Sequence, residues 1–479
     1  MRRLIFLLTI PCLLWACGKA PDPAPQEQVE PAPQDPAPRE PAEPEPEGLV
    51  LCTDAPLVIE VGEGAQLGTS GLIQVFKADG TLVDKIDLND MAKVKVLEDG
   101  TMVPSEQTAS VHTFMDKLSS GSATRTVHYT PLRLSGGQLV IKPHSGVLAF
   151  GGSYYVTVDA SVAGKAVGKE DMPFTAKRAP SGTRLQVKPD GSGDFCTVQG
   201  ALSYAASLGK DTAVTIEVGE GTYGELLFLQ GKNNVTVKGA SREGSVIAYP
   251  NSEVYMGGSE KRCLFLATDC DKLVLENLTI ENTFYASDHK GQAETIYYNA
   301  HTASFRLTVE NCSLISWQDT FLCKGEVWVH NSLIAGHCDY IWGYPKACLF
   351  EDCEIRSRAA GYIVQARVPG AADKGFVFLN CRLTAEAGVP DGKMYLARSG
   401  GDKSVYDHVT YVNCEMSPVI APAGWHTGKA PTPVTPTATA GWKEYGTTGV
   451  STASRNAYGK ILTAKEAEPY SSKQAVLGW

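Results

Sequence analysis

The chain has 479 residues, a formal net charge of −10 and a hydrophobic content of 43%. This length exceeds one ordinary domain, and the hydrophobic content is sufficient for buried cores. The acidic balance argues against a nucleic-acid-binding protein, which would need a basic surface to contact phosphates. Much of the charge lies in residues 21–48, which contain eight acids and one base, Arg39.

Residues 1–17 have the pattern of a secretory signal. A basic start precedes an apolar stretch, Leu4 to Leu14, that is too short to span a bilayer. The stretch ends in LWAC, which resembles a bacterial lipobox with Cys17 as the lipidated residue. An ordinary cleaved signal peptide is the alternative. We expect an exported protein that is lipid-anchored at Cys17 to the bacterial outer membrane, on its periplasmic or cell-surface side.

Residues 18–48 and 49–180 form two further predicted units. The first is rich in Pro, Glu and Ala, which favours an extended, solvated tether without a core. The second contains short alternating runs such as LIQVFKA, QLVIKP and SYYVTVDA, separated by turn residues. This pattern predicts a small β-sandwich domain of Ig-like type. It acts either as a spacer, which we favour, or as a carbohydrate-binding module.

Residues 181–479 carry a repeated strand pattern. An Asn or Asp recurs between apolar positions in six segments, at Asn277, Asn311, Asn331, Asp352, Asn380 and Asn413. The uneven spacing with a constant strand signature predicts a right-handed parallel β-helix with long turns on one side. A helix over residues 197–207 is expected to cap its open end. Cysteines that directly follow four of these positions are expected to stack inside the solenoid.

Two acids stand out against this repeat. Asp319 follows Asn311 by eight residues, and Asp339 follows Asn331 by eight. If each repeat is one rung, the two carboxylates lie on neighbouring rungs, roughly 5 Å apart. Two acids this close cannot both ionise easily, so one of them should retain a proton near neutral pH. This pair is the candidate acid/base site.

Several motifs in order resemble the pectin methylesterase (pectinesterase) family. They are DGSGDFCTVQGAL, GTYGELL, GQAETI, SWQDTFL, DYIWG, MYLARSG, PAGWH and KEYGTTG, beginning near residue 183 and continuing toward the C-terminus. The resemblance implies a carbohydrate esterase that removes C6 methyl esters from pectin (homogalacturonan), without a cofactor or a metal. We expect a monomer.

The resemblance also implies roles for five residues. Asp339 corresponds to the nucleophile, Asp319 to the general acid/base, and Arg398 to the arginine that pairs with the nucleophile. Gln318 and Gln292 correspond to the amides that stabilise the oxyanion. An arginine beside Asp339 should lower the pKa of that carboxyl and leave the elevated pKa to Asp319.

One departure concerns the substrate cleft. The family usually reads Leu-Gly-Arg-Pro-Trp where this chain has LARSG, so Ser399 and Gly400 replace Pro and the cleft Trp. Sugars stack on aromatic rings, and Trp342 is the first candidate for a replacement ring. Tyr340 and Trp425 are the other expected substrate-binding aromatics.

Other functions remain open at this point. A related β-helix esterase or thioesterase could act on a different acyl group. A Ca²⁺-dependent pectate lyase could use paired carboxylates, although Arg398 would oppose the cation. A non-catalytic polysaccharide-binding protein would bind pectin and release nothing. Eleven cysteines remain outside the signal and lipobox; they form no CxxC pair, and their disulfide state is open.

Overall fold

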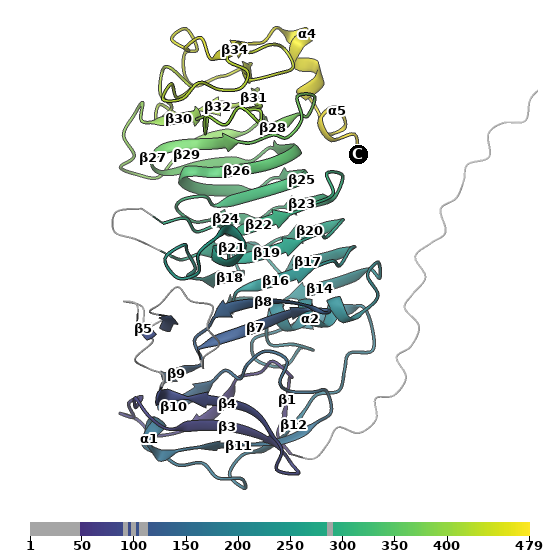
Figure 1. Ribbon diagram of the computed structural model, residues 1–479, viewed down its shortest axis with the longest axis vertical. Coiled ribbons are helices and arrows are strands. Elements are labelled where there is room, and N and C mark those ends of the chain that lie inside the picture. Colours follow the sequence, from purple (N-terminus) through teal and green to yellow (C-terminus); the bar gives the residue numbers. More distant parts are fainter. Residues whose placement is uncertain (1–47, 90–93, 97–101, 105–113, 285–290) are drawn as a thin grey trace, which may run out of the picture. The chain divides into compact units, whose positions relative to one another are not determined.

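The computed structural model describes residues 48–89, 94–96, 102–104, 114–284 and 291–479 (Figure 1). The predicted signal, the lipobox with Cys17 and nearly all of the predicted tether lie outside the described residues. No helix of the described part is long and apolar enough to cross a bilayer.

Two sheets pack face to face in the N-terminal module. One has the strand order β1-β12-β11-β3-β4 and the other β2-β10-β9. Residues of both sheets, among them Ile59, Val75, Leu139 and Val156, share one buried core. This confirms the β-sandwich, whereas the Ig-like type remains a prediction. The strands are β1 (Val50–Leu51), β2 (Leu57–Glu60), β3 (Leu72–Lys77), β4 (Leu82–Asp87), β9 (Leu132–Ser135), β10 (Gln138–Ile141), β11 (Ser153–Val158) and β12 (Pro173–Ala176).

Two hairpins follow β4 in the chain. They are formed by β5 (Val94–Val96) with β6 (Met102–Pro104), and by β7 (Met115–Ser120) with β8 (Ala123–His128). The β7–β8 hairpin lies beside β16 (Leu227–Gln230) and α2 (Val198–Ser207) (Figure 1). Its Leu118 and Val127 belong to the core of the following domain and not to that of the sandwich.

The larger domain is a parallel β-helix, as the sequence predicts. Strands β14 to β22 each pair in parallel with the strand three positions later, so the chain coils through three parallel faces. Its strands are β13 (Arg184–Val187), β14 (Val214–Val218), β15 (Gly221–Tyr223), β16 (Leu227–Gln230), β17 (Val235–Gly239), β18 (Ser245–Tyr249), β19 (Phe265–Thr268), β20 (Leu273–Glu276), β21 (Thr279–Asn282), β22 (Ile296–Asn299), β23 (Arg306–Glu310), β24 (Ser313–Ile315), β25 (Phe321–His330), β26 (Leu333–Glu351), β27 (Glu354–Ala366), β28 (Gly375–Leu379), β29 (Arg382–Ala385), β30 (Met394–Ala397), β31 (Val409–Val412), β32 (Glu415–Met416), β33 (Trp442–Tyr445) and β34 (Gly459–Ile461).

The repeated Asn or Asp marks one corner of each rung. All six residues adopt left-handed backbone conformations, with φ between 47° and 56°. Asn and Asp tolerate this conformation better than other side chains that carry a Cβ. Neighbouring corners are linked, because Asn311 Nδ2 donates to Asn277 Oδ1 at 2.8 Å. The repeated Asn or Asp in the sequence therefore marks the position at which the chain turns from one face of the β-helix to the next.

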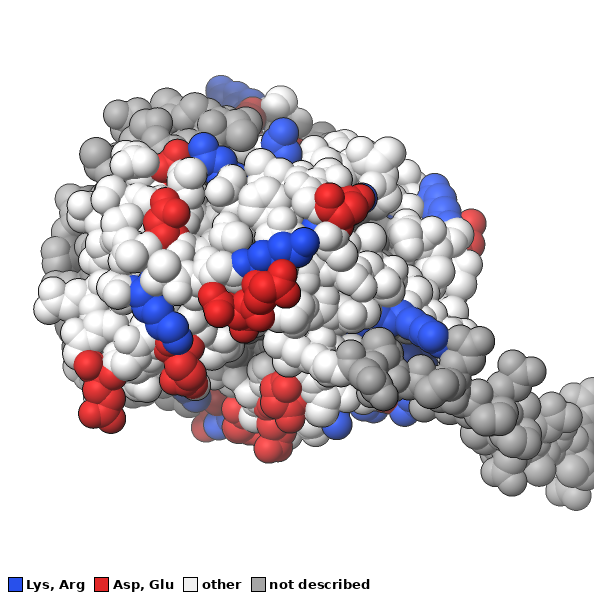
Figure 2. Space-filling view, turned by 90° about the horizontal axis from the view of Figure 1, so that it is seen from below, with Lys and Arg blue, Asp and Glu red and all other residues white. Residues whose placement is uncertain are grey.

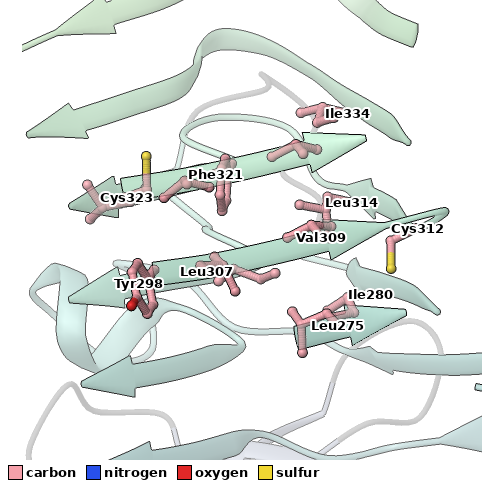
Figure 3. Packing of buried hydrophobic residues seen from close by; sticks show 14 of the residues in the cluster. Leu275, Ile280, Tyr298, Leu307, Val309, Cys312, Leu314, Phe321, Cys323 and Ile334 are labelled. Atoms are coloured by element: carbon pink, nitrogen blue, oxygen red, sulfur yellow. The ribbon is translucent and has the colours of Figure 1, made fainter. Parts of the chain in front are cut away.

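Inward-facing side chains of successive rungs stack in the core (Figure 3). The rings of Phe350, Phe378 and Tyr411 form one such column, with centroids 4.8 Å and 4.5 Å apart. Four cysteines that follow the corner residues are buried in this interior, as predicted: Cys312, Cys353, Cys381 and Cys414.

The described residues also form several short helices. Helix α2 (Val198–Ser207) packs against β14 and β16, and the Thr197 side chain caps it by accepting from Gly200 N. This confirms the predicted capping helix. The other helices are α1 (Ala160–Ala163), α3 (Ser259–Arg262), α4 (Ala464–Ala467), the 3₁₀ helix η2 (Glu468–Tyr470) and α5 (Lys473–Leu477).

Charged side chains on the face shown in Figure 2 are mixed in sign. Lys and Arg lie among Asp and Glu there, and they do not merge into a basic patch. This face gives no support to nucleic-acid binding.

Candidate active site

The two predicted carboxylates lie on neighbouring rungs of the β-helix. Gln318 pairs with Cys338 in a parallel bridge, and Asp319 N donates to Cys338 O at 3.1 Å. The backbones of Asp319 and Asp339 adopt left-handed conformations, with φ of 66° and 48°. Such strained positions concentrate at functional sites. Both side chains are buried, so the predicted acid pair is confirmed as a geometric feature.

Asp339 is held by an arginine and an amide. Arg398, which directly follows β30, donates from Nε to Oδ1 at 2.8 Å and from Nη2 to Oδ2. Gln365 Nε2 donates to Oδ2 at 2.9 Å. The predicted Arg398 pairing is confirmed, whereas Gln365 was missed because nothing in its local sequence marks it.

Burial raises the pKa of Asp339, and the charge of Arg398 opposes this rise. The predicted lowering by Arg398 is present, but the elevated pKa is not left to Asp319 alone, because the pKa values of both carboxyls are raised. Desolvation of the buried carboxyl outweighs the arginine. The role left to Arg398 is to limit the rise and to fix the orientation of the carboxylate.

Asp319 has a different environment. Gln292 Nε2 donates to Oδ2 at 2.9 Å and Arg262 Nη2 donates to the same oxygen at 3.1 Å. Burial raises the pKa of Asp319 well above its ordinary value. The charges of Glu294 and Asp339 add to this rise, while Arg262 opposes it. The direction predicted for this acid is confirmed.

Arg262 and Glu294 form a buried ion pair that the sequence did not reveal. Arg262 Nε donates to Glu294 Oε2 at 2.9 Å, and Nη1 donates to Glu253 Oε2 at 2.8 Å. Burial also raises the pKa of Glu294. Glu294 lies inside the motif GQAETI, whose Gln292 drew attention instead. The Arg262 guanidinium thus contacts two buried acids, Asp319 and Glu294, which favours a proton being retained on one of them.

The two predicted glutamines align on successive rungs. Gln292 pairs with Gln318 in a parallel bridge. The Gln292 side chain accepts from Arg262 through Oε1, which directs its NH₂ toward Asp319. Gln318 is half-buried, and its side chain makes no hydrogen bond to the described residues. Its amide is therefore available to a ligand beside the two aspartates.

Comparisons with known proteins agree with this geometry. The family model described as Pectinesterase matches residues 184–478. The chain belongs to the pectinesterase family.

Pectinesterase 31 of Arabidopsis thaliana is 30% identical over 254 residues, which are 50% of this chain and 76% of that protein. A crystal structure of the pectin methylesterase from Aspergillus niger is 27% identical and has a TM-score of 0.51. It covers 63% of this chain and 95% of its own. A pectin methylesterase in complex with a hexasaccharide, at 22% identity and a TM-score of 0.53, covers 63% of this chain and 98% of its own and shares the fold.

Only one of the three expected substrate-binding aromatics faces a cleft in this pectinesterase. Tyr340 is fully buried, with its hydroxyl 3.4 Å from Ser357 Oγ. Trp425 is also fully buried and stacks on Trp442 at 5.3 Å. These two predictions are wrong, because both rings are core residues. The ring of Trp342 lines a cleft of about 590 Å³.

This cleft combines aromatic rings with cations. Tyr297, Tyr344 and Trp342 line it together with Lys324 and Arg367. The Arg367 guanidinium lies 5.1 Å from the centre of the Trp342 ring. Gln365 Oε1 accepts from Arg367 at 2.6 Å, and Gln365 in turn donates to Asp339. Hydrogen bonds therefore connect the cleft to the Asp339 carboxylate.

Proposed function

We propose that this pectinesterase removes C6 methyl esters from pectin by covalent catalysis at Asp339. The observation that carries the proposal is the pair of buried carboxylates on adjacent rungs with different partners. Asp339 is held by Arg398, while Asp319 shares Arg262 with Glu294, and burial together with the charges of Glu294 and Asp339 raises its pKa. This division suits a nucleophile and a proton donor.

In the first half of the reaction, an Asp339 oxygen attacks the ester carbonyl carbon. The developing oxyanion is stabilised by the Gln318 amide, with Gln292 as a second donor. Such a donor contributes about 3 kcal/mol to lowering a barrier of this kind. The tetrahedral intermediate collapses as the C–O bond to methanol breaks. Protonated Asp319 gives its proton to the oxygen of the departing methanol. The acyl group of the galacturonate stays bound to Asp339 as an anhydride.

In the second half, Asp319 acts as a base. Its carboxylate takes a proton from water, and the resulting hydroxide attacks the acyl carbon of the galacturonate. The bond to Asp339 breaks, which releases a free uronate and restores both side chains. The two guanidinium groups of Arg262 and Arg398 contact these carboxylates, which disfavours the Ca²⁺ site that a lyase would need.

The aromatic and cationic cleft is the proposed binding site for the neighbouring sugars of the polymer. In this proposal Trp342, which lines the cleft although only 7% of it is exposed, takes the place of the missing cleft tryptophan. Lys324 and Arg367 suit uronate carboxylates that have already lost their methyl groups.

Replacing Arg398 by Ala should raise the pH that activity requires. The guanidinium opposes the rise in the pKa of Asp339 caused by burial. Without it, the pKa of Asp339 rises further, so the nucleophile ionises only at higher pH. The acid limb of kcat/KM against pH should move to higher pH, and the rate at neutral pH should fall at least about tenfold.

The matched control for this experiment is Arg382→Ala. Arg382 is an exposed arginine on the same solenoid, 3.4 Å from Glu354. An acid limb that is unchanged in Arg398→Ala would contradict the pairing as a functional contact.

The function itself is tested by methanol release from highly methylated pectin, using residues 48–479 with and without EDTA. We expect release that EDTA does not affect and no unsaturated uronides. Unsaturated products that vanish with EDTA would instead indicate a metal-dependent lyase. Pectin that binds without methanol release would refute the esterase assignment.

We further propose that the enzyme is exported as a monomer and anchored through a lipid on Cys17. The support is the LWAC sequence after a short apolar stretch, followed by the Pro- and Glu-rich residues 18–48. Labelling with a radioactive fatty acid should mark the full chain and not Cys17→Ser. Equal labelling of both would contradict the anchor.

A further inference from the structure

The β7–β8 hairpin precedes the β-helix in the sequence, yet it contacts the surroundings of the active site. Met115 of β7 packs with Tyr255, Met256, Phe284 and Ala293. Ala293 lies between Gln292 and Glu294, both of which belong to the site described above. A hairpin of the N-terminal module therefore forms part of the support behind the catalytic residues.

Arg125 of β8 makes the most specific of these contacts. It is buried at 5% exposure, and its guanidinium donates to backbone carbonyls of the β-helix. Nη1 bonds Leu227 O at 2.7 Å and Leu264 O at 3.2 Å, while Nη2 bonds Lys261 O at 3.0 Å and Cys263 O. Within the described residues no carboxylate accepts from Arg125, and burial lowers its pKa. Burying a charge against neutral carbonyls is costly, which points to a positional role.

The two carbonyls bound by Nη2 flank Arg262. The Arg262 side chain donates hydrogen bonds to Asp319 and Glu294. The same two carbonyls accept from Asn251 Nδ2 at 2.8 Å and 3.0 Å. Asn251 is in turn bonded by His128 of β8 at 3.2 Å. The hairpin thus holds the backbone of Arg262 through two routes.

We propose that Arg125 is a positioning residue of the active site. By holding the carbonyls on either side of Arg262, it keeps the Arg262 guanidinium against Asp319. The inference relies on the proposed role of Asp319, and it makes the β7–β8 hairpin a working part of the esterase.

The test follows the titration of the Asp319 carboxyl by ¹³C NMR, with its signal assigned by loss in Asp319→Asn. In Arg125→Met, Arg262 is released and Asp319 loses a stabilising positive charge. The midpoint of the titration should rise by about one pH unit, the lower end of what an adjacent opposite charge produces. The alkaline limb of kcat should move upward with it, and KM should stay unchanged.

Arg125→Lys keeps the charge but lacks the two-armed fork, so it should give a smaller shift in the same direction; it decides the question if Arg125→Met does not fold. Arg133→Met, at an exposed arginine of β9, is the matched control. Wild-type titration and kcat, with only a lower thermal midpoint, would overturn the positioning role. Because the NMR titration needs no pectin, a wild type that releases no methanol would refute the function separately.

A second inference concerns two free cysteines, one in the sandwich and one at the start of the β-helix. Cys52 directly follows β1, and Cys196 directly precedes the N-cap of α2. Their sulfur atoms and an Asp54 oxygen all lie within 4.8 Å of one another. The hydrogen bonds of Asp54 are already used, since Oδ2 accepts from Thr197 N at 2.8 Å and Thr197 Oγ1 at 2.6 Å. Lys177 Nζ binds Gly191 O and Gly193 O, the same carbonyls that Cys52 Sγ contacts.

We infer that Cys52 and Cys196 form a disulfide in the exported protein. A cation is disfavoured there by the Lys177 ammonium and by the occupied Asp54 carboxylate. In the first step a Cys52 thiolate attacks a small-molecule disulfide, such as oxidised glutathione, and releases one thiolate. The Cys196 thiolate then attacks Cys52 Sγ and releases the second thiolate. The two leaving thiolates take up the two protein protons, so the oxidant is reduced to two thiols.

The test is peptide mapping without reduction after oxidative refolding of residues 48–479 with oxidised glutathione. We expect one linked peptide pair, which is lost in Cys196→Ser but kept in Cys312→Ser, a variant at a buried rung cysteine. The wild type should unfold several degrees higher when oxidised than when reduced. Eleven alkylated thiols, or stoichiometric zinc with both thiols protected, would overturn the inference.

Discussion

Replacing Asp339 by Asn is expected to lower kcat on methylated pectin by on the order of 10⁴-fold. The amide cannot attack the ester carbonyl, so no acyl intermediate forms. The fold should persist, because Asn has the same shape and tolerates the left-handed backbone at this position. Initial rates of methanol release and the thermal midpoint measure the two parts of this prediction.

Asp352→Asn is the matched control for that experiment. Asp352 also has a left-handed backbone, but it is an exposed corner residue of the kind that is Asn in five other rungs. Its replacement should leave turnover unchanged. An Asp339→Asn variant that retains a tenth of wild-type activity would show that another group attacks the ester.

Replacing Asp319 by Asn is expected to lower kcat by about 10³-fold, the range of general acid–base catalysis. Methoxide is a poor leaving group and needs the proton that Asp319 donates. In a trifluoroethyl ester of the same polymer the leaving group is trifluoroethoxide, which departs without the proton from Asp319. Asp319→Asn should therefore release one equivalent of trifluoroethanol quickly and then stall, because water still lacks its base.

Rapid-quench measurement of the first turnover tests this prediction. The contradictory outcome is an equally slow first turnover for methyl and trifluoroethyl esters. Asp319 would then support the site without donating the proton. The raised pKa of Asp319, which is caused mainly by burial, would then make no contribution to catalysis.

The sequence predicted the parts of the fold that repeat. The corner Asn and Asp residues are local requirements of the backbone, so they are visible in sequence and place Asp319 and Asp339 on adjacent rungs. Arg398 was found through the motif LARSG. The adjacent rungs were predicted from short-range geometry and Arg398 from motif order. The structure confirms both predictions.

The missed contacts depend on long-range packing. Arg262 reaches Asp319 across 57 residues and Gln365 reaches Asp339 across 26, with no periodic signal. Tyr340 and Trp425 were misjudged because sequence does not show which aromatic rings turn inward. The net upward shift of the pKa of Asp339 was not predicted, because the extent of burial is known only from the fold.

The central claim, an acyl intermediate on Asp339, is tested most directly by methanol exchange. Methylated pectin is incubated with the wild type, Asp339→Asn and Asp352→Asn in buffer that contains trideuteromethanol. An acyl intermediate can be intercepted by this alcohol, so the wild type and Asp352→Asn should release methanol and place labelled methyl groups in the polymer. Asp339→Asn should do neither. Methanol release by the wild type with no label in the polymer at any alcohol concentration would contradict the claim, because water would then attack the ester directly.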